Sequence, residues 1–230
     1  MDLLVEVIRP HDPDILTLVG SAEVRRPLRY LSDGRRRQVA QPVEAAGEDW
    51  IVRRLYEPPQ RLAVVGSDPF ALAIAAAGLQ QGWQVTLIRP NGPSVPPPLA
   101  VAYSTAAPDV ALSKLAPDPW TAVAVASHDS ELDHKALYAA LTSSAGYVGV
   151  LGSRRRLEER RERLLSAGLA PGLFARLRAP IGLPIAARSP REIAVAVIAE
   201  ILDHRPSSVA CFEPIRAVAA SVWEPAPACD

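Results

Sequence analysis

The pattern of apolar and polar positions changes near residue 60. Beyond it, short apolar runs alternate with longer segments of helical length, which is typical of buried strands between helices. The predicted strands are residues 62–65, 83–88, 99–103, 121–126 and 147–151, with a short edge element at 177–181. The predicted helices are residues 70–81, 131–142, 154–165 and 190–202. This alternation predicts an α/β fold whose mostly parallel sheet is covered by helices on both faces.

Residues 1–57 read instead as a series of short strands. The apolar runs are 3–8, 15–19, 24–31, 37–42 and 50–56. Asp33-Gly34 lies between two of these runs, where an Asp-Gly pair signals a β-hairpin. We therefore predict a small N-terminal antiparallel β unit at 1–58, an α/β domain at 59–205 and a C-terminal extension at 206–230.

The helix at 190–202 carries the clearest local signals. Ser189 is placed to cap it, Pro190 is its first residue, and Glu192 completes a Ser-x-x-Glu capping box. Its interior is apolar nearly all round, which predicts burial against the sheet and a neighbouring helix. Glu200 is the exception, and we expect it to be paired or at an exposed edge rather than functional.

Composition limits the classes of protein to which the chain can belong. The chain has 230 residues, 49% of them hydrophobic and 22% charged, with a formal net charge of zero. This balance argues against a general affinity for nucleic acid or anionic membranes, and no apolar run reaches the roughly 18 residues of a membrane span. Cys211 and Cys229 fit neither a metal-binding spacing nor a disulfide framework. We expect a cytoplasmic protein.

The turn after the first α/β strand resembles a dinucleotide fingerprint but departs from it. It reads Gly66-Ser67-Asp68-Pro69, and Asp68 replaces the glycine that lets a pyrophosphate approach the backbone. Asp68 either repels phosphate or caps the next helix, with Pro69 as its first residue, and capping is favoured. Arg89, after the next strand, stands where NAD sites usually have an acid. It either pairs with a 2′-phosphate or is surface charge.

Ser127-His128-Asp129 follows the strand at 121–126. His128 and Asp129 suit acid–base chemistry or metal ligation. The alternative is that Ser127 or Asp129 caps the following helix and leaves His128 exposed. Both interpretations remain open at this point.

Gly152, Ser153 and Arg154 follow the strand at 147–151 and open a charged helix. Free backbone N–H groups, a hydroxyl and an arginine at such a turn predict an anion site. The other arginines of this helix are expected to form a solvated face. Because ligands of parallel sheets bind outside the carboxyl ends of the strands, this turn is expected to meet residues 66–68, Arg89 and residues 127–129 at one edge of the sheet.

Three blocks in residues 60–204 resemble the C-terminal domain of XdhC/CoxI-type proteins, which are accessory factors for molybdenum hydroxylases such as xanthine dehydrogenase and carbon monoxide dehydrogenase. The blocks are Ser127-His128-Asp129 with Asp133, then 147–164, then 179–201. The sequence departs from the family pattern at Asp68, Arg89 and Pro184.

The resemblance implies a Rossmann-like fold and a non-catalytic protein that binds molybdenum cofactor, assists its sulfuration and delivers it to an apo hydroxylase. It implies a homodimer, with a cysteine desulfurase as a further partner. The implied cofactor-binding residues are His128, Asp129, Gly152, Ser153 and Arg154, together with the first turn at Gly66, Ser67 and Asp68. Alternatives are an NAD(P)-dependent oxidoreductase, and a scaffold protein that has lost its ligand site.

Overall fold

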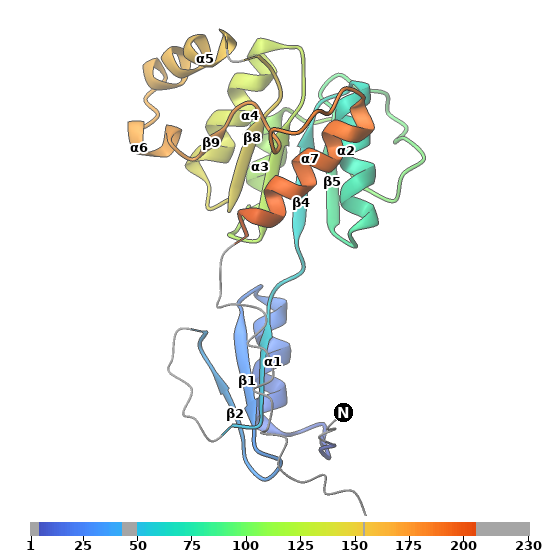
Figure 1. The fold of residues 1–230 in the computed structure, drawn as a ribbon, viewed down its shortest axis with the longest axis vertical. Coiled ribbons are helices and arrows are strands. Elements are labelled where there is room, and N and C mark those ends of the chain that lie inside the picture. The colour runs from blue at the N-terminus through green and yellow to red at the C-terminus, as the bar shows by residue number, and fades with distance from the viewer. Residues whose placement is uncertain (1–4, 43–49, 154, 206–230) are drawn as a thin grey trace, which may run out of the picture. The chain divides into compact units, whose positions relative to one another are not determined.

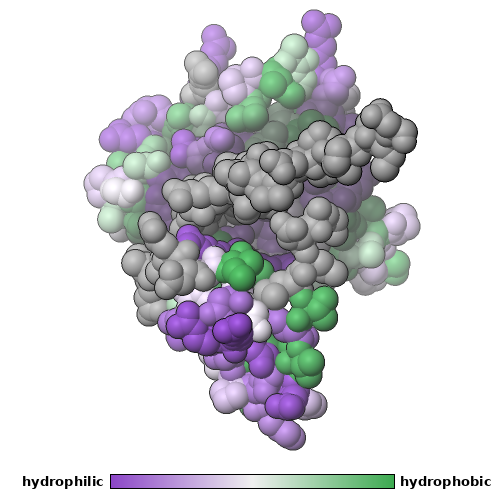
Figure 2. All heavy atoms as spheres, turned by 60° about the horizontal axis from the view of Figure 1, so that its bottom comes forward, coloured by the Kyte–Doolittle hydropathy of each residue, from purple (hydrophilic) through white to green (hydrophobic). Residues whose placement is uncertain are grey.

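The computed structural model describes residues 5–42, 50–153 and 155–205 (Figure 1). The chain forms two compact units, Pro58–Pro206 and Met1–Glu57 with Ser207–Asp230. Arg154, Cys211 and Cys229 lie outside the described residues. Within the described ranges, no helix combines the length and apolarity needed to cross a bilayer. Hydrophobic and hydrophilic residues lie interspersed on the face shown in Figure 2.

The unit Pro58–Pro206 is built on a six-stranded sheet in the order β6-β5-β4-β7-β8-β9, and every neighbouring pair is parallel. The strands are β4 (Arg61–Val65), β5 (Gln84–Ile88), β6 (Ala102–Ser104), β7 (Thr121–Val125), β8 (Tyr147–Val150) and β9 (Leu177–Arg178). This is the doubly wound order of a Rossmann-like fold. The chain switches direction across the sheet between β4 and β7, and such a switch point opens a crevice at the carboxyl ends of the strands.

Helices cover both faces of this sheet (Figure 1). On one face, α2 (Pro69–Gln80) and α7 (Pro190–Asp203) bury apolar residues such as Ile74 and Val197 against β4, β5 and β7. On the other face pack α3 (Pro108–Leu115), α4 (Ser130–Thr142), α5 (Arg155–Ser166) and α6 (Pro171–Phe174). The central strands are apolar on both sides for this reason, as their sequence predicts.

The predicted strands and helices of this unit are present, with shifts of a few residues at their ends. The weak strand at 99–103 is observed as β6, and the edge element at 177–181 as the two residues of β9. The sequence interpretation missed α3 and α6. A signal for α3 existed, because Pro108 is at its first position and Asp109 lies in its first turn.

The unit Met1–Glu57 holds an antiparallel sheet in the order β2-β1-β3. Its strands are β1 (Leu28–Ser32), β2 (Arg37–Ala40) and β3 (Val52–Tyr56), and β1 and β2 form the hairpin predicted around Asp33-Gly34.

Two predicted strands of this unit are wrong. Residues 15–19 lie in helix α1 (Pro13–Glu23), which has Pro13 at its first position and Asp14 in its first turn. An apolar run this short does not separate a strand from a helix, and the helix-start signals decide. In the run at 3–8, the described residues 5–8 form no strand, and residues 3–4 lie outside the described ranges. Glu6 contacts side chains of β1. Its carboxylate accepts hydrogen bonds from Tyr30 and Ser32, both at 2.6 Å.

The caps of α7 confirm the local signals of that helix. The Ser189 side chain accepts a hydrogen bond from the Glu192 backbone N–H, and the Glu192 carboxylate accepts one from the Ser189 backbone N–H. Glu200 is paired, as expected: it accepts hydrogen bonds from the Tyr147 hydroxyl at 2.5 Å and from the Gly182 backbone N–H at 2.6 Å.

Candidate functional site

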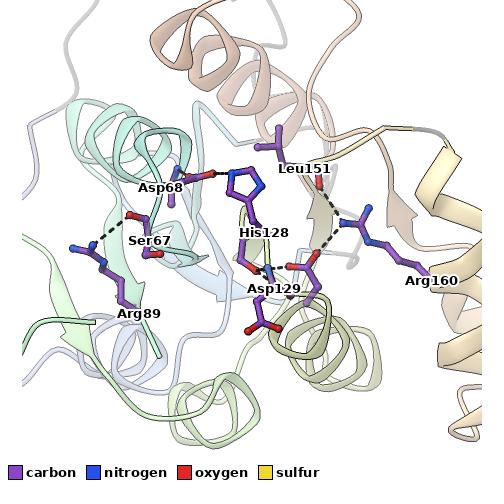
Figure 3. A network of polar contacts seen from close by, with 10 residues as sticks. Ser67, Asp68, Arg89, His128, Asp129, Leu151 and Arg160 are labelled. Carbon is purple, nitrogen blue, oxygen red and sulfur yellow. Dashed lines mark hydrogen bonds and ion pairs between the residues drawn. The ribbon is translucent and has the colours of Figure 1, made fainter. Parts of the chain in front are cut away.

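The crevice begins at Gly66, directly after β4. Its φ of +148° lies in the region that favours glycine, and a Cβ at this position would lie 1.8 Å from the carbonyl oxygen of Ala126. The backbones that follow β4 and β7 therefore pass too closely for any side chain here. This close approach brings the turn at 66–68 beside the turn at 127–129 (Figure 3).

Asp68 joins these two turns. One carboxylate oxygen, Oδ1, accepts a hydrogen bond from the Ala71 backbone N–H at 2.8 Å, which confirms the prediction that Asp68 caps α2. The other oxygen, Oδ2, lies 3.1 Å from Nε2 of His128. The side chain of Asp68 is 10% exposed and that of His128 is 76% exposed. A nearly buried carboxylate thus lies beside an exposed imidazole (Figure 3), although Oδ2 of Asp68 has no hydrogen-bond partner within the described residues.

Arg89 lies at the rim of the same crevice. Its Nη2 donates a hydrogen bond to the Ser67 carbonyl oxygen at 3.3 Å, so the side chain reaches across to the first turn. Its Nε is buried and has no hydrogen-bond partner within the described part of the chain. Arg89 thus contacts the first turn, next to Pro90 and Asn91 of the crevice lining, and its pairing with a 2′-phosphate stays a prediction.

Asp129 caps α4. Its Oδ1 accepts hydrogen bonds from the backbone N–H groups of Glu131 at 2.8 Å and Leu132 at 3.2 Å. Ser127 plays a different part, since its hydroxyl donates to Oδ1 of Asp133 at 2.8 Å. Capping by Asp129 and exposure of His128 are both observed, and neither excludes ligand binding by His128.

Sequence reasoning missed Arg160 of α5. Its Nη2 donates to Oδ2 of Asp133 at 2.8 Å and to the Leu151 carbonyl oxygen at 3.4 Å. The exposed fractions of the two side chains are 13% for Arg160 and 5% for Asp133. The expectation of a solvated arginine face is therefore wrong at this position. A signal existed, because Arg160 is one turn before Leu164, the buried residue of α5, and so shares its face.

Gly152 makes room for this arginine. Its φ is +145°, and a Cβ at this position would lie 2.9 Å from Nη1 of Arg160. Ser153 is exposed at the start of α5. The predicted third member of this turn, Arg154, lies outside the described residues. The missing side chain of Gly152 thus leaves room for the guanidinium of Arg160 in its ion pair with Asp133.

Two pockets meet at His128. One of about 580 Å³ lies at the carboxyl ends of the strands, and its lining includes Gly66, Ser67, Asp68, Ser127, His128 and Asp129. The other, of about 310 Å³, lies between α4 and α5 and is also lined by His128. We call the first the crevice and the second the α4–α5 groove. The structure thus brings together the first-turn and 127–129 candidates, and Gly152 adjoins the groove through Arg160.

This sheet order, with a crevice at its switch point, defines a Rossmann-like α/β protein. Residues 62–201 match the family described as the XdhC Rossmann domain, and the chain belongs to this family.

Two curated relatives each match a little under two thirds of the chain. The chain is 34% identical over 152 residues to a Bacillus subtilis (strain 168) protein named as a probable xanthine dehydrogenase subunit. The match covers 65% of this chain and 44% of that protein. It is 30% identical over 147 residues to the "Uncharacterized protein YqeB" of Escherichia coli (strain K12), covering 62% of this chain and 27% of that protein. The chain thus spans less than half the length of either relative.

A solved structure supports the fold. A crystal structure described as that of a xanthine dehydrogenase from Bacillus halodurans superposes with a TM-score of 0.60 at 20% identity, covering 89% of this chain and 69% of that chain.

Proposed function

We propose that this chain is an accessory protein for a molybdenum hydroxylase of the xanthine dehydrogenase type, and that its crevice binds molybdenum cofactor as cargo. Membership of the XdhC family and the likeness to a probable xanthine dehydrogenase subunit of Bacillus subtilis support this role. The observation that carries the proposal is the convergence of Asp68, His128 and Asp129 on one crevice at the switch point.

The crevice fits the pterin part of this cargo. A pterin ring presents amide and amino N–H groups along one edge, and carboxylates accept such bonds. Oδ2 of Asp129 has no partner within the described residues, and Nδ1 of His128 likewise makes no bond there. The volume of about 580 Å³ is also within the range of small-molecule sites, about 300–1,000 Å³.

The crevice fits a dinucleotide less well. In a dinucleotide site the pyrophosphate lies on free N–H groups at the start of the first helix. Here the carboxylate of Asp68 already accepts the Ala71 N–H and places negative charge at that position. We therefore favour cofactor delivery over an NAD(P)-dependent oxidoreductase. No chemical step on the cargo is assigned to this chain.

The test is titration of the full chain with molybdopterin, followed by addition of the loaded protein to an apo hydroxylase. We expect saturable binding at micromolar concentration and a gain of hydroxylase activity. His128→Ala should weaken binding about three- to tenfold, because it removes one hydrogen-bonding group from an exposed position.

His11→Ala is the matched control, since His11 is an exposed histidine of the other unit. It should leave binding unchanged. Absence of both binding and hydroxylase activation would overturn the proposal. Saturable binding of NADPH but not NADH, lost in Arg89→Ala, would favour the oxidoreductase instead.

A further inference from the structure

We propose that the α4–α5 groove is a phosphate subsite, so that a ligand of the crevice directs its heterocycle toward Asp68 and Asp129 and its phosphate toward α5. This inference rests on the proposed function for the identity of the heterocycle, but the phosphate subsite is testable alone. It reverses the orientation of a dinucleotide in a Rossmann fold, where phosphate sits at the first helix.

The first step concerns the N-termini of two helices at the crevice, where carboxylates already accept the backbone N–H groups that would otherwise bind an anion. Asp68 accepts the Ala71 N–H at the start of α2, and Asp129 accepts two N–H groups at the start of α4. Each carboxylate satisfies donors that would otherwise face a phosphate, and each adds negative charge. A phosphate on a crevice ligand therefore needs another position.

The second step is the chemistry of the groove. Arg156, Arg160 and Arg163 line it on the α5 side, and His128 and His134 line it on the α4 side. Guanidinium groups bind phosphate through two parallel hydrogen bonds. His128 lines both the groove and the crevice, so the two pockets adjoin at this side chain, and the proposal places one ligand across both.

The third step asks which of these arginines retain donors for a ligand. Both side-chain bonds of Arg160 use Nη2, which leaves the hydrogens on Nη1 and Nε. Arg163 is paired with Glu131 through Nη2. Arg156 makes no ion pair within the described part of the chain, and its side chain is exposed.

The buried ion pair between Arg160 and Asp133 holds part of the groove lining in place. Arg160 is held between Asp133 and the Leu151 carbonyl oxygen, so its remaining donors are preorganised. Arg156 lies one turn earlier on the same helix and supplies the charge that no carboxylate balances within the described residues. Glu159 also lines the groove and opposes an anion, so the subsite is expected to be weak for free phosphate.

The experiment uses inorganic phosphate as the probe on the full chain, followed by amide chemical shifts in two-dimensional NMR at constant ionic strength set with chloride. We expect saturable shifts centred on amides of α4 and α5. Arg156→Gln should weaken the apparent affinity about threefold or more, and Glu159→Gln should strengthen it, because each alters one charge in the groove.

Arg161→Gln is the matched control, since Arg161 is on the same helix and pairs with Glu158 outside the groove lining. It should leave the affinity unchanged. An equal loss in Arg161→Gln, shifts centred on α2, or no saturable shift would each overturn the subsite. If molybdopterin fails to bind while phosphate still shifts α4 and α5, the proposed function falls and the subsite stands.

Discussion

At the scale of single residues, the crevice and the α4–α5 groove each depend on a glycine at a close approach. Gly66 allows the backbones after β4 and β7 to approach, and Gly152 leaves room for the guanidinium of Arg160. The sequence indicated both glycines and the capping role of Asp68, because their signals are local. It did not indicate that Arg160 turns inward, because that depends on Asp133 of another helix.

Gly66→Ala should destabilise the protein by about 3–5 kcal/mol, because the added Cβ would lie 1.8 Å from a backbone oxygen and φ is positive. Gly82→Ala is the control, since φ there is +72° and a Cβ meets nothing within 4 Å. It should cost only about 1–2 kcal/mol. Urea denaturation followed by circular dichroism measures both, and similar losses would contradict the argument from close approach.

Arg160→Met should destabilise the protein by about 3–5 kcal/mol, because it leaves the buried carboxylate of Asp133 without its cation. The double variant with Asp133→Asn should be more stable than Arg160→Met alone, since the unpaired charge is then gone. Arg161→Gln should change stability by less than about 1 kcal/mol, as expected for an exposed pair. Urea midpoints of the three variants decide, and a double variant no more stable than Arg160→Met alone would speak against a coupled pair.

At the scale of elements, helix ends were the feature that the sequence predicted best. Ser189, Pro190 and Glu192 mark the start of α7, and the structure confirms the capping box. Residues 15–19 show the opposite case, since a short apolar run carries no period of its own and the prediction of a strand is wrong. Structural features that depend only on residues within one turn of the chain can be predicted from the sequence. Features that depend on contact with another helix or strand cannot.

Ser189→Ala should lower stability by about 1 kcal/mol, because the side chain that accepts the Glu192 N–H is lost. Ser189→Asp should retain most of the stability, since Asp also caps helices well. Thermal or urea unfolding measures the difference, and an Asp variant as unstable as the Ala variant would contradict a capping role.

The capping box should also give a pH dependence. Hydrogen bonds from the backbone N–H groups of Ser189 and Arg188 hold the pKa of Glu192 below its usual 4.5. The stabilising contribution is therefore complete above the usual pKa and is lost as pH falls through the lowered one. Glu192→Gln should differ most from the native protein near neutral pH, and the difference should shrink toward about pH 3. A constant difference in urea midpoint across this range would contradict the assignment.

At the scale of the whole molecule, the chain order of strands and helices was enough to predict the parallel sheet. The spatial order β6-β5-β4-β7-β8-β9 was not predicted from the sequence and is observed in the structure. The two apolar clusters on the faces of this sheet are formed by residues of the unit Pro58–Pro206. This unit therefore has a core of its own.

A fragment of residues 58–206 should fold alone and unfold cooperatively, because both faces of its sheet are covered by its own helices. Its phosphate-induced shifts on α4 and α5 should match those of the full chain. Circular dichroism and NMR dispersion measure folding, and a fragment without a cooperative transition would show that the first unit completes the core.

The ion pair between Asp133 and Arg160 has a consequence for how this family can diverge. Loss of either partner alone leaves the other largely buried without its counter-charge, so a change at only one of the two positions lowers stability. Relatives are expected to keep both or to have exchanged both for neutral residues. Where the arginine has gone, a side chain at position 152 no longer meets a guanidinium, but the φ of +145° there still favours glycine.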